Sequence, residues 1–257
     1  LFTYLAIAGF IGLLLSIFGT MAVFAWYARD LPRPDKVKRV DGLSTIIYDR
    51  SGQTLYDIYE GQNRIPVNFN EIPTPLKQAT IAVEDKDFYK HPGLSITGIG
   101  RAVVGVLLFH NYSAGGGSTL TQQLVKNVLL TNQQAFSRKI KEAILAIQIE
   151  RKYTKDEILT MYFNEAPYGG PAVGVEAAAQ YFFGKKAKDL TFVESVILAG
   201  LPQSPTQYNP FTSTDKLWIA RSEQVLRRMR EDGYISADAE KDAKAQLQGV
   251  VFGKEDA

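Results

Sequence analysis

The chain opens with a long apolar stretch. Residues 1–27 contain no charged side chain, and Trp26 and Tyr27 close the stretch. About 20 apolar residues suffice to cross a bilayer, and amphipathic aromatic rings favour the membrane–water interface. A signal peptide or a buried core helix would be the alternatives, but the run is too long for a signal h-region and no small-residue cleavage site follows it. Residues 1–28 are therefore predicted to form a transmembrane helix.

The pattern then changes from charged to alternating. Residues 29–43 are rich in charge and contain prolines, which predicts a linker. Residues 44–59 alternate apolar and polar positions on both sides of residues 49–52, where Gly52 supplies the positive φ of a tight turn. We predict a β-hairpin in this segment.

Helical periodicity dominates the remaining chain. Residues 74–75 place a proline in the first turn of a helix, and residues 154–157 and 191–194 both have the spacing of a capping box. Residues 137–151 carry an apolar stripe, and a last long helical region stops at Gly233. The predicted fold class is mainly α, with a small β-hairpin and one N-terminal transmembrane helix.

One apolar segment has two interpretations. Residues 94–112 contain a single cation, Arg101, and are followed by glycine-rich residues 113–117. The pattern fits a mobile element that touches lipid, and it fits an ordinary buried helix beside a flexible loop equally well. Periodicity alone does not separate these two structures.

Composition narrows the chemistry. The 257 residues allow one sizeable domain with accessory segments, and a net charge of only +2 argues against a nucleic-acid binder. The absence of cysteine excludes disulfides, thiolate catalysis and cysteine-based metal sites, and two histidines are too few for a multi-histidine metal cage. Any catalysis must therefore use carboxylates, hydroxyls, amides and cations.

Two stretches carry candidate groups for a reaction on a sugar or a phosphate. Glu84 and Asp85 follow an apolar helical run, where partial desolvation can make a carboxylate a useful base, although a solvated helix end has the same pattern. Hydroxyls and amides after the glycine-rich loop suit an oxygen-rich ligand at a helix N-terminus, and one of the hydroxyls could equally be a helix cap. These residues are Ser118, Thr119, Gln122 and Gln123.

A third stretch mixes cations with a carboxylate. Arg138 and Glu142 are one helical turn apart, with Lys141 beside them. The simplest interpretation is a surface ion pair worth roughly 0.3–0.5 kcal/mol. The functional interpretation is a cation group that neutralises a diphosphate, which could also recruit a divalent metal through phosphate oxygens.

Taken in order, these stretches resemble the motifs of the peptidoglycan glycosyltransferase family (glycosyltransferase family 51), which occurs at the front of class A penicillin-binding proteins and as monofunctional transglycosylases. The resemblance covers about residues 44–211. Its motifs are Glu84-Asp85-x-x-Phe88-x-x-His91-x-Gly93, Gly116-x-Ser118-Thr119-x-Thr121-Gln122-Gln123, Arg138-Lys139-x-x-Glu142, Lys155-x-x-Ile158-Leu159-x-x-Tyr162-x-Asn164 and residues 194–210.

The resemblance implies a domain organisation. Residues 44–212 would form a lysozyme-like glycosyltransferase domain, within which residues 94–117 form a jaw that touches the membrane. Residues 213–257 would be a helical tail or linker toward a transpeptidase domain in a longer protein, and a monofunctional enzyme is the alternative. Ser213-x-x-Lys216 matches a penicillin-binding pattern but lacks a following Lys-Thr-Gly, so it is interpreted as coincidence.

The resemblance also implies an activity. The enzyme would polymerise lipid II into β-1,4-linked glycan strands by inverting displacement of undecaprenyl diphosphate. Glu84 and Glu142 would be the catalytic residues, Glu84 as the base and Glu142 positioning cations or a divalent ion. The substrate-binding residues would be Arg101, Ser118, Thr119, Gln122, Gln123, Lys126, Arg138 and Lys141, with support from Asp85, Phe88, His91 and Asn164.

The expected partners and location follow from this family. We expect no tightly bound cofactor, although Mg²⁺ or Mn²⁺ could bridge the diphosphate. The partners would be lipid II, the lipid-linked glycan strand, membrane lipids and proteins of cell-wall synthesis or division, and no nucleic acid. The catalytic domain would lie outside the bacterial cytoplasmic membrane, although the basic residues between 29 and 39 would by charge counting lie inside.

Two rival functions share parts of this pattern. A lytic transglycosylase or muramidase would cleave glycan, and it would need a protonated acid but not the cations Lys126 and Arg138. A membrane-anchored scaffold would bind lipid II or division proteins without catalysis. The joint presence of Glu84, Glu142, Gln122 and Lys126 favours the polymerase.

Overall fold

The structure is a computed structural model that describes residues 2–29, 31–37, 44–51, 54–59, 61–95, 97–98, 100, 117–130, 135–213 and 215–253. Arg101 and most of the predicted jaw, residues 94–117, lie outside the described residues. The α-helices are α1 (Phe2–Ala28), α2 (Thr74–Glu84), α4 (Leu120–Leu129), α5 (Ala135–Lys152), α6 (Lys155–Glu165), α7 (Val175–Phe183), α8 (Phe192–Gly200), α9 (Leu217–Glu231) and α10 (Ala237–Leu247). Short 3₁₀ helices cover Pro34–Val37, Phe69–Glu71, Ala187–Asp189 and Leu201–Gln203.

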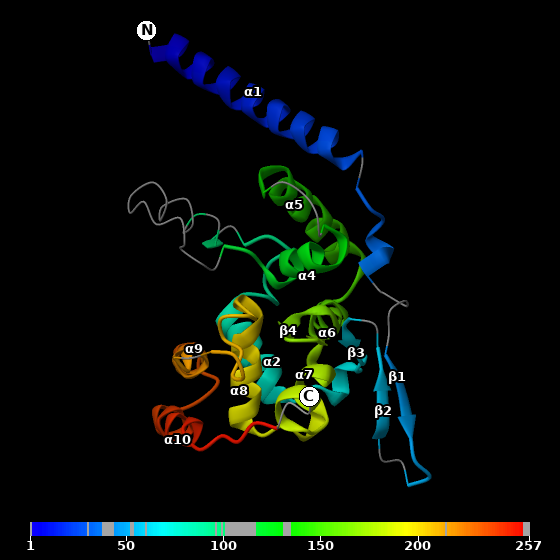
Figure 1. Cartoon of the computed structure of the whole chain (residues 1–257). Coiled ribbons are helices and arrows are strands. Elements are labelled where there is room, and N and C mark those ends of the chain that lie inside the picture. The colour runs from blue at the N-terminus through cyan, green and yellow to red at the C-terminus, as the bar shows by residue number, and fades with distance from the viewer. Residues whose placement is uncertain are drawn as a thin grey trace.

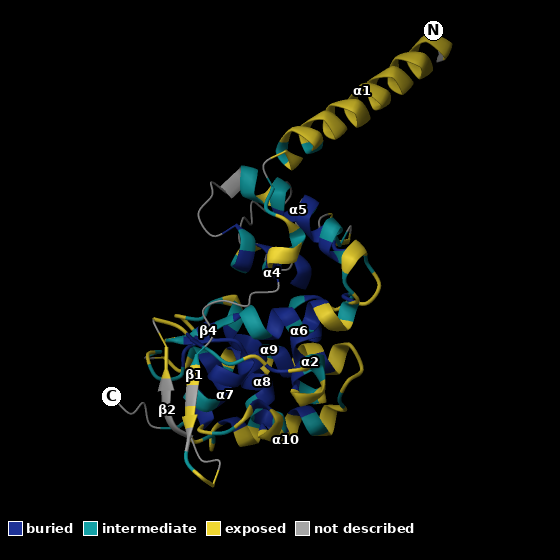
Figure 2. Ribbon diagram, turned by 90° about the vertical axis from the view of Figure 1, so that its right-hand side faces the viewer, coloured by how far each residue is buried: buried dark blue, intermediate teal, exposed yellow. Residues whose placement is uncertain are grey.

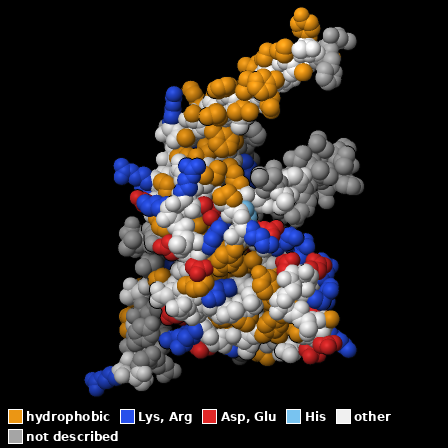
Figure 3. Space-filling model, turned by 180° about the vertical axis from the view of Figure 1, so that it is seen from behind, with side chains coloured by type: hydrophobic (Ala, Val, Ile, Leu, Met, Phe, Trp, Pro, Cys, Tyr) orange, Lys and Arg blue, Asp and Glu red, His pale blue; other side chains and the backbone are white. Residues whose placement is uncertain are grey.

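Helix α1 projects away from the folded body (Figure 1). Most of its apolar side chains are exposed, as the yellow ribbon of Figure 2 shows, and Phe24 and Tyr27 near its end are half-buried. In Figure 3, hydrophobic side chains cover the visible face of α1, and basic side chains lie on the body beneath it. Thr3–Ala28 has a mean hydropathy of 2.2 and is, by length and composition, able to cross a membrane. The predicted N-terminal apolar helix is confirmed.

The predicted hairpin is also present. Strands β1 (Thr45–Tyr48) and β2 (Thr54–Ile58) pair antiparallel, and the register shifts between Ile47 and Tyr48. At the turn, the carboxylate of Asp49 accepts a hydrogen bond from the Ser51 N–H at 2.8 Å. The hairpin lies along one side of the body (Figure 1).

A second small sheet was not predicted. Its strand order is β3 (Asn63–Arg64), β5 (Ala172–Val173) and β4 (Pro167–Gly169), with β3 parallel and β4 antiparallel to β5. Strands of two or three residues give no alternating pattern that a sequence could display. This sheet brings residues 63–64 beside the end of α6, a contact that helps to form the site described below.

The helices form two groups with α6 between them. Helices α4 and α5 lie on the side of the body nearer to α1, and α2, α7, α8, α9 and α10 lie on the far side (Figures 1 and 2). Helix α2 packs against both α8 and α9, and α4 packs against α5 and α6. The core is one cluster of buried side chains that spans both groups and includes Leu76, Phe88, Leu124 and Tyr162. The mainly α fold is confirmed.

The predicted helix starts agree with the structure. Thr154 and Thr191 each cap a helix and form the expected capping box with the glutamate three residues later. Helix α2 carries Pro75 in its first turn. Beyond the predicted boundary at residue 212, α9 packs against α2 and α8, and the division of the chain at that point stays a prediction.

Candidate active site

Glu84 ends helix α2 and is held on both carboxylate oxygens. Oε1 accepts a hydrogen bond from Arg221 Nη2 at 2.7 Å, and Oε2 accepts one from Gln123 Nε2 at 2.9 Å. The side chain of Glu84 is 9% exposed and that of Arg221 4%. Arg221 belongs to α9 and Gln123 to α4, so the carboxylate lies where three helices meet.

The residues after Glu84 join this corner to the start of α4. Asp85 is buried, and its carboxylate accepts hydrogen bonds from His91 Nε2 at 2.9 Å and from the Leu120 N–H at 3.0 Å. Because His91 Nδ1 accepts the Gly93 N–H at 3.2 Å, the ring proton is placed on Nε2. A carboxylate at the N-terminus of α4 also meets the positive end of the helix dipole. Asp85 and His91 thus connect the end of α2, where Glu84 lies, to the start of α4.

Gly93 allows a close approach between the first motif and α5. Its φ is +92°, and a Cβ atom there would lie 2.9 Å from Glu150 Cγ and 3.0 Å from the Ala146 carbonyl oxygen. The Gly93 carbonyl accepts a hydrogen bond from Thr119 Oγ1 at 2.7 Å. Gly93 therefore brings residues 91–93 into contact with both α4 and α5.

Thr119 and Gln122 form a capping box at the start of α4. The Thr119 hydroxyl accepts the Gln122 N–H, and Gln122 Oε1 accepts the Thr119 N–H at 3.0 Å. Both residues are buried. The cap that the sequence allowed is therefore present, and contact of either side chain with a substrate stays a prediction.

The buried carboxylate of Glu142 forms ion pairs with two cations of α5. Glu142 is 1% exposed, and its two oxygens lie 3.3 Å from Arg138 Nε and 2.7 Å from Lys139 Nζ. Lys139 Nζ also donates to Ser118 Oγ at 2.9 Å, which links α5 to the residue before the α4 cap. Lys139 was missed as a site residue, although its spacing of three from Glu142 could have indicated it. Lys141 is half-buried on the same helix.

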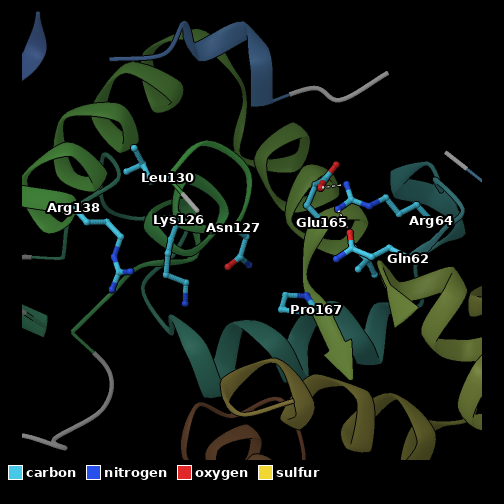
Figure 4. Close-up of a pocket in the computed structure, with 9 residues that line it drawn as sticks. Gln62, Arg64, Lys126, Asn127, Leu130, Arg138, Glu165 and Pro167 are labelled. Carbon is cyan, nitrogen blue, oxygen red and sulfur yellow. Dashed lines mark hydrogen bonds and ion pairs between the residues drawn. The ribbon is translucent and has the colours of Figure 1, made fainter. Parts of the chain in front are cut away.

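A cleft of about 430 Å³ opens beside this cluster. Figure 4 shows Lys126 and Arg138 on one side of the opening and Arg64, Gln62 and Glu165 on the other. The complete lining is Gln62, Arg64, Lys126, Asn127, Leu130, Arg138, Glu165, Pro167 and Val173. Two of the predicted cations, Lys126 and Arg138, therefore lie together in the cleft.

The opposite side of the cleft was not predicted. Arg64 Nη1 donates to Glu165 Oε2 at 3.0 Å and Arg64 Nη2 donates to Gln62 Oε1 at 2.6 Å. The charges of Arg64 and Glu165 compensate each other, whereas Lys126 has no ion-pair partner among the described residues. The cleft thus has a cationic side and a more nearly neutral, hydrogen-bonding side.

Asn164 and Lys155 each bind backbone groups of segments far away in the sequence. Asn164 Oδ1 accepts a hydrogen bond from the Val67 N–H at 2.9 Å, and Asn164 Nδ2 donates one to the Val67 carbonyl at 3.0 Å. Lys155 Nζ donates to the His91 carbonyl at 2.7 Å and to Glu150 at 2.8 Å. Its ammonium group also lies 4.5 Å from the centroid of Phe88, which is fully buried. These side chains join the motifs to one another.

Tyr162 lies in the same interior as Glu84. Burial raises the pKa of Tyr162 well above its usual value, and the negative charge of Glu84 raises it further, while Arg221 acts in the opposite direction. The Tyr162 hydroxyl has no hydrogen-bond partner within the part of the chain that the structure describes. Burial and the charge of Glu84 therefore favour the neutral phenol form of Tyr162.

The described residues contain no group of three or more histidine, aspartate or glutamate side chains placed to hold a metal ion. Glu142, the carboxylate of the basic cluster, has one oxygen, Oε1, without a hydrogen bond. A divalent ion would therefore need phosphate oxygens for most of its coordination, since Mg²⁺ commonly takes only one or two carboxylates from a protein.

Comparisons with known proteins agree on one family. The sequence model of the family described as Transglycosylase matches residues 51–230. Penicillin-binding protein 1A of Rickettsia bellii is 45% identical over 224 residues, which cover 86% of this chain and 28% of the relative. Penicillin-binding protein 1F of Bacillus subtilis is 41% identical over 221 residues, which cover 86% of this chain and 30% of the relative. The chain thus spans less than a third of the length of these two relatives.

A solved structure was also matched. The 2.6 Å crystal structure of penicillin-binding protein 1A from Haemophilus influenzae aligns with 82% of this chain and 21% of its own, at 25% identity and a TM-score of 0.47.

Proposed function

Because the chain belongs to the Transglycosylase family and is a glycosyltransferase of peptidoglycan synthesis, we propose that it polymerises lipid II into β-1,4-linked glycan strands and releases undecaprenyl diphosphate. The observation that carries this proposal is that the Glu84 carboxylate is fixed by hydrogen bonds to Arg221 and Gln123, and that Gln123 lies on the helix that supplies Lys126 to the cationic cleft. Gln123, which donates to Glu84, and Lys126, which lines the cleft, are three residues apart on α4. They therefore share one face of that helix.

Glu84 is the general base in this proposal. Its carboxylate removes the proton from the 4-hydroxyl of the acceptor N-acetylglucosamine as that oxygen attacks the anomeric carbon of the donor. The bond from that carbon to the diphosphate oxygen breaks, and its electron pair leaves with the diphosphate. An α-linked donor then gives a β-linked product, as in other single displacements with inversion. A positioned base of this kind contributes about 10²–10⁴-fold.

The cationic side of the cleft receives the diphosphate. Lys126 and Arg138 supply positive charge where negative charge develops on the leaving group, so a strong acid is not needed there. Glu142 and Lys139 hold Arg138 and Ser118 in place around that charge. Arg101, the third predicted cation, lies outside the described residues.

A divalent ion would add to this neutralisation. Mg²⁺ or Mn²⁺ would be held mainly by the diphosphate oxygens, because Glu142 Oε1 is buried and already pairs with Arg138 Nε at 3.3 Å. The protein's own cations already provide charge at the same place, so the chemistry proposed for Glu84 and Lys126 does not depend on the ion.

The membrane side of the proposal rests on α1 and α5. Helix α5, which carries Arg138 and Glu142, contacts α1. A lipid-linked substrate keeps its diphosphate close to the bilayer surface, so cations near the anchor suit it. We therefore place the catalytic domain at the outer surface of the cytoplasmic membrane, with membrane lipids and cell-wall synthesis or division proteins as its surroundings.

The test is polymerisation of labelled lipid II by the detergent-purified protein. We expect long glycan strands from the parent, a loss of about 10²-fold or more in Glu84→Gln, and a smaller loss in Glu142→Gln. Glu223→Gln, an exposed carboxylate change on α9, is the matched control and should keep the parent rate. Circular dichroism and thermal unfolding establish that each variant is folded.

Two outcomes would replace the proposal. If the folded parent shortens preformed glycan, the protein is a lytic enzyme. If it neither lengthens nor shortens glycan in any detergent, with or without divalent ions, it is a scaffold.

A further inference from the structure

Arg221 is a cation in the apolar face of a helix. Helix α9 buries Trp218, Val225 and Met229 against α2 and α8, and Arg221 lies on that same face with a side chain only 4% exposed. A buried charge costs several kcal/mol unless it is paired and hydrogen-bonded. The presence of Arg221 there calls for a partner, and the partner is Glu84.

The guanidinium is anchored at three points. Nε donates to the Gly200 carbonyl at 3.1 Å, Nη1 donates to Gln224 Oε1 at 2.8 Å, and Nη2 donates to Glu84 Oε1 at 2.7 Å. The Gly200 carbonyl ends α8 and Gln224 lies one turn further along α9. Because two other hydrogen bonds fix the planar guanidinium, its orientation sets the orientation of the Glu84 carboxylate.

Gly200 makes room for this arrangement. A Cβ atom at Gly200 would lie 2.9 Å from Arg221 Cγ. The φ angle of Gly200 is −80°, which any residue can adopt, so backbone conformation does not require glycine there. Glycine is required because a larger residue would occupy the space of the Arg221 side chain.

The groups around Glu84 leave Arg221 as its one charged hydrogen-bond partner among the described residues. Helix α4 contributes Gln123, a neutral amide, and α6 contributes Tyr162, a neutral phenol. On the side of the first motif, Asp85 and His91 are bonded to each other. Helix α8 contributes the Gly200 carbonyl, which faces the arginine.

We propose that Arg221 is the positioning residue of the catalytic base: it pairs with the Glu84 carboxylate in a buried corner and turns its oxygens toward the acceptor hydroxyl. This inference rests on the proposed role of Glu84. Arg221 does not touch the substrate and acts only through Glu84. A purely structural role, in which the ion pair merely fastens α9 to α2, predicts a loss of stability without a change in the pH profile.

The kinetic test compares Arg221→Gln and Arg221→Lys with Arg228→Gln. Arg228 lies on the exposed face of the same helix and bonds Glu231, so its loss should leave the rate unchanged. We expect Arg221→Gln to lower kcat by roughly 10²-fold, the cost of a misplaced catalytic group, with little change in KM. The acidic limb of the kcat/KM profile should move to higher pH, and Arg221→Lys should recover part of the rate and of the shift.

Gly200→Ala offers a second route to the same result. It leaves both charged side chains in place and displaces only the arginine stem, so it should lower kcat in the same direction as Arg221→Gln. An unchanged kcat and pH profile in folded Arg221→Gln would overturn the proposal, as would a loss confined to KM.

A stability measurement separates this inference from the proposed function. Thermal unfolding of the parent, Glu84→Gln, Arg221→Gln and the double variant forms a cycle that needs no activity. We expect the double variant to unfold at a higher temperature than additivity predicts, since each single change leaves a buried partner behind. Additive shifts would overturn the proposed role of Arg221 even in an active enzyme. A coupled pair in a protein that does not polymerise lipid II would overturn only the proposed function.

Discussion

At the scale of single residues, the site combines charges that are compensated with charges that are not. Glu84 has Arg221, Glu142 has Arg138 and Lys139, and Arg64 has Glu165. Lys126 is exposed in the cleft and has no ion-pair partner among the described residues. An uncompensated cation in a cleft is free to meet a ligand's negative charge, whereas Arg138 shares its charge with Glu142.

This difference predicts a large effect for Lys126→Ala. Removing the Lys126 ammonium group should lower the rate of the proposed lipid II polymerisation by about 10²-fold, because a leaving diphosphate would lose a preorganised positive charge. Lys241→Ala, on the exposed face of α10, removes the same charge far from the cleft and serves as the control. Equal rates in the two variants would remove Lys126 from the diphosphate site.

At the scale of elements, short polar motifs fasten the helices at their ends. Helix α8 begins with the capping box of Thr191 and Glu194, and Lys185 pairs with the same glutamate at 2.9 Å. Burial by itself would raise the pKa of Glu194, but the hydrogen bonds from Thr191 and Lys185 outweigh it and place the pKa below its ordinary value of 4.5. The folded state therefore favours the ionised carboxylate more than the unfolded state does.

The sign of this shift predicts an acid-sensitive start of α8. The contribution of Glu194 is fully present above its ordinary pKa of 4.5 and is lost as the pH falls through the lower folded value. Glu194→Gln keeps an acceptor for the cap but does not ionise. Thermal unfolding followed from about pH 6 to pH 3 should therefore fall less steeply in this variant than in the parent.

The exposed carboxylate of Glu223 provides the comparison. Glu223→Gln should leave the slope of thermal stability against pH close to that of the parent. If Glu194→Gln has the parent's slope as well, the ion pair with Lys185 does not link α8 to pH.

At the scale of the whole molecule, an apolar helix is joined to a body with a polar surface. Helix α1 has its side chains exposed, and the described body presents many basic and acidic groups (Figures 2 and 3). In water alone such an apolar surface would favour aggregation. A bilayer removes this cost, and it would also hold the cleft near the lipid-linked substrate that we propose.

This architecture predicts how the protein attaches to membranes. The double variant Leu13→Arg/Leu14→Arg places two charges near the middle of α1, each at a cost of about 3 kcal/mol in the bilayer. Its retention in membranes washed with alkaline carbonate should fall well below that of the parent. Leu13→Ala/Leu14→Ala, which keeps the helix uncharged, should be retained. Full retention of the arginine variant would show that another segment anchors the chain.

The sequence by itself determined the features that lie within a few residues of one another. The apolar helix, the hairpin around Asp49 and the capping boxes at Thr154 and Thr191 depend on local spacing, and the structure has all of them. The resemblance to the family also indicated Glu84, Lys126, Arg138 and Glu142, because the order of the motifs along the sequence identifies these residues before their positions in space are known.

Only the tertiary structure decided which distant groups meet. Arg221 reaches Glu84 across 137 positions of sequence, and Arg64 reaches Glu165 across 101. The helical spacing of Arg221 among apolar residues can be read from the sequence, but which residue Arg221 pairs with depends on how α9 packs against α2. Side-chain periodicity specifies which face of a helix is buried, and only the packing of several helices together specifies what that face touches.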